Sequence, residues 1–69
     1  MSEERGPVRI PHDVFRGLDT VRRRGPTDQM DITEVQLWLN EMGYHTAAEW
    51  LRDHREEYLR GLVHGFEPR

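Results

Sequence analysis

Residues 29–66 read QMDITEVQLWLNEMGYHTAAEWLRDHREEYLRGLVHGF, and this segment contains two helix-start signals in succession. In the segments DITE (31–34) and TAAE (46–49), a short side chain with an oxygen atom stands three positions before a glutamate. That spacing is typical of a capping box at the start of a helix. Gly43 lies between the signals, where a helix that ends near Met42 needs a residue in the left-handed conformation. The pattern therefore predicts a helix, a tight turn and a second helix.

A further helix is expected before this hairpin, from His12 to Arg24. Pro11 suits its first turn, where a backbone N–H is not needed, and the Gly25-Pro26 pair ends it. Its apolar stripe consists of Val14, Leu18 and Val21, with Ile10 and Phe15 at the edges.

The helix expected at residues 32–42 carries apolar side chains on two sides. Leu37 falls opposite the main apolar face, and a helix with two apolar sides usually contacts two neighbours. We therefore expect this helix to lie in the middle of the structure. The main face consists of Ile32, Val35, Trp38, Leu39 and Met42.

Arg55 falls inside the apolar face of the last helix, which begins near Ala47 and reaches Val63. Either the helix breaks near His54 and Arg55 turns outward, or it is unbroken and Arg55 reaches an acidic group or a partner chain. No Gly or Pro interrupts residues 47–60, so we favour the unbroken helix. Its face consists of Ala47, Leu51, Tyr58, Leu59, Leu62, Val63 and Phe66.

The expected fold class is all-α, with three helices, or four if the last one breaks. A single helical domain is expected at residues 10–66, since 69 residues allow one domain at most. Residues 1–9 contain the Gly6-Pro7 breaker and are expected to form a flexible tail. Residues 8–10 can extend briefly before Pro11. Residues 67–69 are expected to be frayed.

Composition favours a soluble helical protein, with 35% hydrophobic and 33% charged residues and no cysteine. No apolar run approaches the roughly 18 residues that span a bilayer, and the charged N-terminus does not resemble a signal peptide. We therefore expect a cytoplasmic protein without membrane contact. Residues 1–26 hold six Arg against four acidic residues, whereas residues 27–69 hold four Arg against nine. The acidic second part argues against wrapping a nucleic-acid backbone.

Several short motifs occur in an order that resembles a family of small phage and prophage proteins, which is catalogued as a domain of unknown function. The motifs are RGPTDQMD (24–31), VQ (35–36), NEMGY (40–44), WL (50–51), HREEY (54–58) and GF (65–66), and the match covers roughly residues 8–66. The resemblance implies a phage or prophage origin, and hence the cytoplasm of a host cell. It brings no catalytic residues with it.

No catalytic, cofactor or metal motif stands out. His54 and Glu57 lie one helical turn apart, but a metal site normally needs a third or fourth ligand. The pair of helices around Gly43 has only part of the helix-turn-helix spacing, because Glu49 occupies a position where an apolar residue is expected. We expect a plain helical hairpin, no bound cofactor or metal, and no enzymatic activity.

Arg22, Arg23 and Arg24 form the one basic cluster of the chain. Three Arg at a helix C-terminus complement the helix dipole, which is a sufficient structural reason for them. The alternative is a site for a phosphate, a nucleotide or a nucleic acid, since the guanidinium group binds such anions well.

The aromatic residues favour a protein interface. Tyr58 is expected in the core, whereas Trp38 and Trp50 lie off the centre of their apolar stripes, and a domain this small has little room for two indoles. With Tyr44 and Arg55, they are our candidate interface residues. The expected function is that of a non-enzymatic interaction protein, by default a homodimer, that binds a host or phage protein and inhibits or modulates a host process such as defence.

Overall fold

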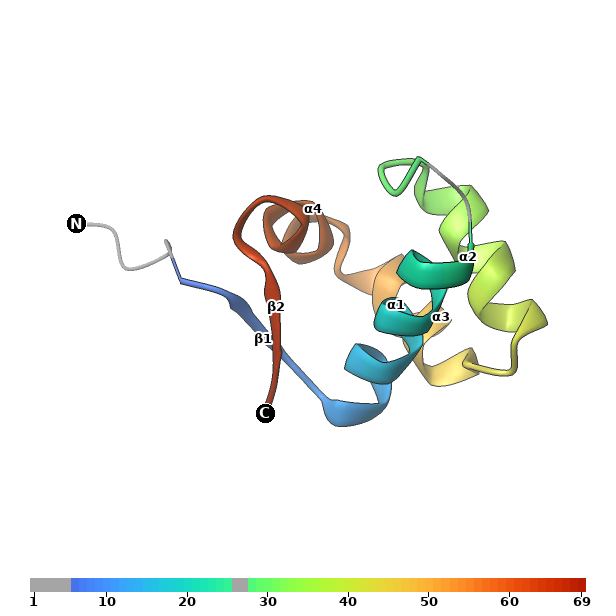
Figure 1. Ribbon diagram of the computed structural model, residues 1–69, viewed down its shortest axis with the longest axis horizontal. Coiled ribbons are helices and arrows are strands. Elements are labelled where there is room, and N and C mark those ends of the chain that lie inside the picture. Colours follow the sequence, from blue (N-terminus) through green and yellow to red (C-terminus); the bar gives the residue numbers. More distant parts are fainter. Residues whose placement is uncertain (1–5, 26–27) are drawn as a thin grey trace.

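The computed structural model describes residues 6–25 and 28–69, and its elements follow the order β, four helices, β (Figure 1). The fold is mostly helical, as expected, but the strand pair means that it is not strictly all-α. The elements are β1 (Val8–Ile10), α1 (His12–Arg24), α2 (Ile32–Glu41), α3 (His45–Asp53), α4 (Arg55–His64) and β2 (Phe66–Pro68).

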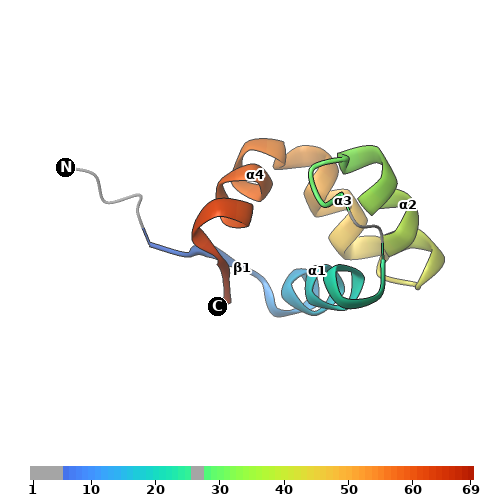
Figure 2. The same cartoon turned by 45° about the horizontal axis from the view of Figure 1, so that its top comes forward.

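The two strands join the ends of the chain in a parallel pair at one end of the molecule, while α2 lies at the other (Figures 1 and 2). Val8 pairs with Phe66, and Ile10 pairs with Pro68. The brief extension expected at residues 8–10 is therefore a strand with both apolar side chains buried. The stretch 1–9, expected as a flexible tail, is described only from Gly6 onward. The expectation that residues 67–69 fray is wrong, because Glu67 and Pro68 belong to β2 and the Arg69 N–H donates to the carbonyl of Ile10 (2.9 Å).

Helix α1 has the bounds that the sequence predicts, and its stripe of Val14, Leu18 and Val21 is buried. Gly17 lies on the same face, where α1 crosses α3. A Cβ atom at residue 17 would come within 2.8 Å of the Cβ atom of Ala47, so the glycine permits the close approach of the two helices.

The hairpin of α2 and α3 confirms one of the two predicted caps. The Asp31 carboxylate accepts the backbone N–H of Glu34 (3.2 Å) at the start of α2. Gly43 has φ +89° and follows the end of α2, as predicted. The next helix, however, begins at His45, and no side chain caps it, so the predicted start at Thr46 is wrong.

The turn itself explains the earlier start of α3. The Gly43 N–H donates to the Asn40 carbonyl (3.1 Å), and the Tyr44 N–H donates to the Leu39 carbonyl (2.8 Å). These two bonds form a Schellman motif, which brings the chain out of α2 at Tyr44. The carbonyl of Tyr44 then accepts the N–H of Ala48 (3.1 Å), so the first turn of α3 starts directly from the motif.

Helix α3, and not α2, lies in the middle of the helices, which corrects the expectation from Leu37. That side chain is 58% exposed. Helix α3 instead packs against α1 and against α2, with Ala47, Ala48 and Leu51 buried. Two consecutive alanines bring neighbouring backbones close on two sides, which one exposed leucine in α2 does not do.

The unbroken last helix is also wrong: the chain breaks at His54, with φ −132° and ψ 51°. The His54 ring stacks on the Trp50 ring, with centroids 4.8 Å apart, and its Nδ1 atom lies 2.9 Å from the Trp50 carbonyl oxygen. The break resets the direction of the following side chains. Tyr58 enters the core, as expected, while Arg55 is exposed.

Candidate functional site

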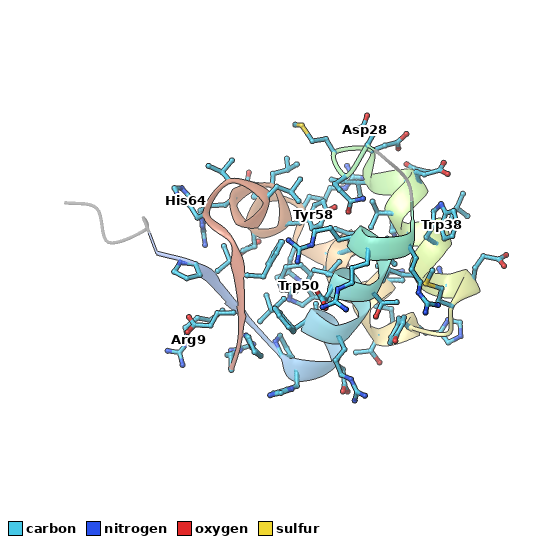
Figure 3. The ribbon with its side chains drawn as sticks, viewed as in Figure 1. Arg9, Asp28, Trp38, Trp50, Tyr58 and His64 are labelled. Atoms are coloured by element: carbon cyan, nitrogen blue, oxygen red, sulfur yellow. The ribbon has the colours of Figure 1, made fainter. Side chains whose placement is uncertain are left out.

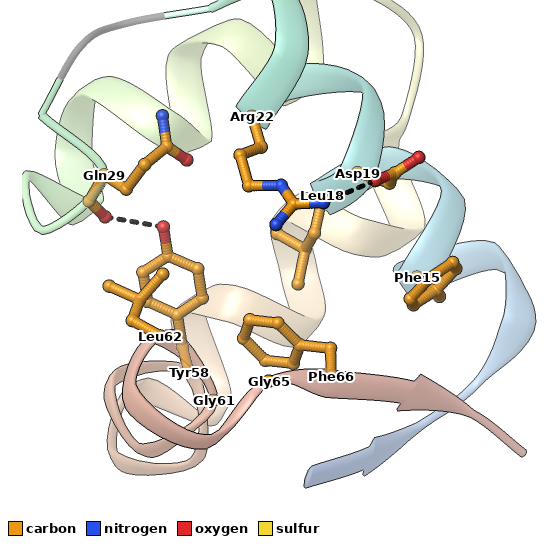
Figure 4. A pocket seen from close by; sticks show the side chains of 10 residues that line it. All are labelled: Phe15, Leu18, Asp19, Arg22, Gln29, Tyr58, Gly61, Leu62, Gly65 and Phe66. Atoms are coloured by element: carbon orange, nitrogen blue, oxygen red, sulfur yellow. Dashed lines mark hydrogen bonds and ion pairs between the residues drawn. The ribbon is translucent and has the colours of Figure 1, made fainter. Parts of the chain in front are cut away.

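A cavity of about 280 Å³ lies between α1, the segment before α2, α4 and β2, and it is partly open to solvent (Figure 4). Its apolar side chains come from α1, α4 and β2, and its polar side chains come from α1 and the segment before α2. The lining consists of Phe15, Leu18, Asp19, Arg22, Gln29, Tyr58, Gly61, Leu62, Gly65 and Phe66.

Tyr58 forms one wall of this cavity and connects two of the elements around it. Its hydroxyl group donates a hydrogen bond to the backbone carbonyl of Gln29 (2.5 Å), as Figure 4 shows. Burial, and to a lesser extent the negative charge of Asp28, raises the pKa of Tyr58 from 10.0 to about 12. The hydroxyl group therefore stays protonated at neutral pH, and it holds the segment before α2 against α4.

Phe66 forms a second wall, and its position depends on glycine. Its ring stacks on that of Tyr58, with centroids 5.9 Å apart. A Cβ atom at residue 61 would overlap the Phe66 ring, so Gly61 leaves the space that the ring occupies on α4. Gly65, at φ +95°, turns the chain between α4 and β2. Gly61, which weakens a helix by propensity, and Gly65, which ends α4, thus place the ring beside the cavity.

The structure divides the basic cluster at the end of α1. Arg22 and Arg23 both bind the carboxylate of Asp19, at 3.0 Å and 3.2 Å. Arg22 also lines the cavity. Arg24 is exposed and has no ion-pair partner among residues 6–25 and 28–69. The three side chains therefore do not act as one unit, since one carboxylate already offsets part of their charge.

The candidate interface aromatics are half-buried and pack against the core. The Trp38 indole N–H donates to the Glu34 carboxylate (3.3 Å), and the Trp50 ring stacks on His54. Figure 3 shows Trp38 at the α2 end of the molecule and Trp50 nearer its middle. The Tyr44 hydroxyl lies 3.3 Å from that of Thr20. Each ring is thus partly covered by its own chain.

The most exposed apolar side chains around α4 form a stripe that the sequence reasoning placed in the core. Leu59 is 37% exposed and Val63 is 78% exposed. With Arg55 they occupy positions four residues apart, so the three share one side of α4. Arg55 forms no hydrogen bond or ion pair with any residue that the structure describes. We call these three residues the α4 stripe.

The sequence assigns Leu59 and Val63 to a broad apolar face of the last helix, and the break at His54 does not change their positions relative to Tyr58. At about 100° per residue, Leu59 and Val63 lie about 100° and about 140° around the helix from Tyr58, at the far edge of this face. The burial of Tyr58 therefore turns both side chains toward solvent, and this spacing can be read from the sequence.

Neither a metal site nor a membrane span emerges from the described residues. Among residues 6–25 and 28–69, no group of three or more His, Cys, Asp or Glu is placed to hold a metal ion. Every helix in the same part of the chain is too short or too polar to span a bilayer.

The exposed side of α3 carries Glu49 and Asp53 beside Arg52. Carboxylates at these positions repel phosphates, so the charge of this helix does not favour insertion into a DNA groove.

Comparisons with known proteins leave the family of the chain open: no family model, curated protein or solved structure matches it. The resemblance to small phage and prophage proteins stays a prediction from the sequence motifs.

Proposed function

We propose that this chain is a small non-enzymatic interaction protein that binds a protein partner through the α4 stripe. The observation that supports the proposal best is the combination of two exposed apolar side chains with a guanidinium group that has no partner among the described residues. Single exposed apolar residues are common on protein surfaces. Here, however, Leu59 and Val63 lie one turn apart beside Arg55, and arginine is one of the residues most enriched at the centre of interfaces.

The charge of Arg55 indicates the chemistry of the partner. A guanidinium group beside an apolar surface favours a partner that places a carboxylate next to an apolar side chain. We expect this partner to be a second copy of the chain or a host or phage protein whose activity the binding modulates. Trp38, Trp50 and Tyr44 stay secondary candidates, because each ring is already partly covered by contacts with its own chain.

The proposal is tested by the variant Leu59→Ser/Val63→Ser, with Leu37→Ser as the matched control. Leu37 is 58% exposed on α2, so its substitution removes exposed apolar surface away from α4. Sedimentation of the 8.3 kDa chain over a range of concentrations reports self-association. Affinity capture from the native host, read by mass spectrometry, reports other partners.

We expect the native chain and Leu37→Ser to form the same complex, and the α4 double variant to lose it. The proposal is contradicted if all three chains form the same complexes, or if all three remain monomeric and retain no protein. The alternative of nucleic-acid or nucleotide binding is supported if the chain is retained on an anionic matrix, if this retention requires Arg22 to Arg24, and if it falls steeply with salt.

A further inference from the structure

The cavity beside Tyr58 has the size of a small ligand site. An apolar cavity of about 150 Å³ holds benzene, and ligand pockets begin at about 300 Å³. The volume of about 280 Å³ therefore fits an aromatic ring with a short substituent. The walls suit such a ring, because Leu18, Leu62 and Phe66 contribute apolar surface from three different elements.

The mouth of the cavity carries a donor for the polar end of the ligand. Figure 4 shows the Arg22 guanidinium between Gln29 and Asp19, on the side of the cavity that faces the Tyr58 hydroxyl. A guanidinium group has five N–H donors, and the hydrogen bond to Asp19 uses one of those on Arg22. Among residues 6–25 and 28–69 no other acceptor binds this guanidinium group, so its remaining donors can reach an acceptor in the cavity.

The carboxylate of Asp19 does not cancel this preference for an anion. Asp19 binds Arg23 as well as Arg22, so two positive charges surround one negative charge at the mouth. Asp28 lies outside the lining, and its carboxylate accepts the backbone N–H of Met30 (3.0 Å). The charge of Asp28 acts on Tyr58, so the two arginines and two carboxylates around the cavity balance, and the preference for an anion rests on the position of the Arg22 donors.

We propose that this cavity binds an aromatic carboxylate, with the ring between Leu18, Leu62 and Phe66 and the carboxylate on the guanidinium group of Arg22. The site is separate from the α4 stripe, and the inference does not depend on the proposed function. Two sources supply this chemistry, a free aromatic acid or the C-terminal residue of a polypeptide.

The test compares 3-phenylpropionate with 3-phenylpropionamide, which has the same shape and no charge. Titrations are followed by the backbone amide resonances of the intact chain. For ligands of this size we expect dissociation constants in the range of about 1 mM, with shifts centred on Gly61, Leu62, Gly65 and Phe66. The carboxylate is expected to bind about tenfold more tightly than the amide, because its hydrogen bonds are charge-assisted.

Two arginine variants distinguish a specific contact with Arg22 at the mouth from general electrostatic attraction. Arg22→Gln is expected to abolish the tenfold difference, while Arg24→Gln, a matched change outside the lining, is expected to preserve it. Leu62→Phe fills part of the cavity and is expected to weaken the binding of both probes about fivefold.

The inference is overturned if neither probe binds, if both bind equally to the native chain, or if Arg24→Gln matters as much as Arg22→Gln. A third arm, N-acetyl-alanyl-phenylalanine with a free or an amidated C-terminus, distinguishes the two sources. Tighter binding of the free-ended peptide than of 3-phenylpropionate assigns the site to a polypeptide end. Exclusion of the peptide assigns it to a small acid.

Discussion

The Tyr58 hydroxyl group joins α4 to the segment before α2, and Tyr58→Phe removes this link while keeping the ring. The hydroxyl donates a 2.5 Å hydrogen bond to the Gln29 carbonyl, and Tyr58 is 1% exposed. A typical intramolecular hydrogen bond contributes about 1 kcal/mol, and a carbonyl left without its donor adds to the loss where water does not replace it. Because Gln29 is half-buried, we expect the free energy of unfolding to fall by about 1–2 kcal/mol.

The assay is unfolding by urea and by heat at neutral pH, followed by circular dichroism. For a domain of this size, a loss of about 1 kcal/mol corresponds to a decrease in Tm of about 4–8 °C. Tyr44→Phe is the matched control, because its hydroxyl lies 3.3 Å from that of Thr20 in a half-buried contact. We expect the control to lose less than half as much stability.

Two results would refute this reasoning. If Tyr44→Phe is as destabilising as Tyr58→Phe, the short bond to Gln29 has no special weight. If Tyr58→Phe leaves the midpoint unchanged, the segment before α2 is held by other contacts, and the hydroxyl does not determine the shape of the cavity.

Three more predictions concern titration, packing and capping. The pKa of Tyr58 is about 12 in the folded chain and 10.0 without burial, so its contribution to the free energy of unfolding is full below pH 10.0 and is lost as the pH rises to about 12. Urea titrations at successive pH values should therefore show a smaller decline in the free energy of unfolding for Tyr58→Phe than for the native chain. Gly61→Ala would stabilise an ordinary helix by about 0.8–1.0 kcal/mol. Here the new methyl group overlaps the Phe66 ring, so we expect a lower Tm. A higher Tm would contradict the packing of Phe66 on Gly61. Asp31→Ala should lower the free energy of unfolding, measured by chemical denaturation, by about 1 kcal/mol. Thr46→Ala should change it by no more than about 0.5 kcal/mol, because only the Asp31 side chain caps a helix. Equal losses would show that Thr46 also caps.

Local signals predicted the elements that depend on neighbouring residues. Helix α1 begins and ends where Pro11 and Gly25 indicate, and Asp31 caps α2 as its spacing to Glu34 predicts. Gly43 has the left-handed conformation that the end of α2 requires. These features are set within a few residues of chain, so a single sequence carries the information.

The start of α3 and the break at His54 were harder to predict, because two local arrangements compete there. The capping-box spacing favoured Thr46, whereas the Schellman turn favoured Tyr44 and prevailed. The absence of Gly and Pro favoured one long helix, whereas the chain breaks at His54, where the ring stacks on Trp50 and lies against the Trp50 carbonyl. The misplacement of Leu59 and Val63 has another cause, because both lie at the far edge of the broad face that the sequence assigns to the last helix.

The cavity was not predicted at all. Arg22 was noted as part of a basic cluster, but nothing in the sequence brings it near Phe66, which lies 44 positions further along the chain. The strand pair between residues 8–10 and 66–68 closes this distance. A strand of three residues is too short to show a clear alternation of apolar and polar side chains, and its partner strand lies near the other end of the chain.

The sequence alone thus determined which segments are helical, where α1 and α2 begin, and which apolar stripe of α1 is buried, because capping and apolar periodicity act over a few residues. The tertiary structure decided that α3 is central, that the chain breaks at His54, and that Arg22, Tyr58 and Phe66 share a cavity. These features depend on contacts such as Gly17 with Ala47 and Gly61 with Phe66, in which the space left by one segment is filled by another.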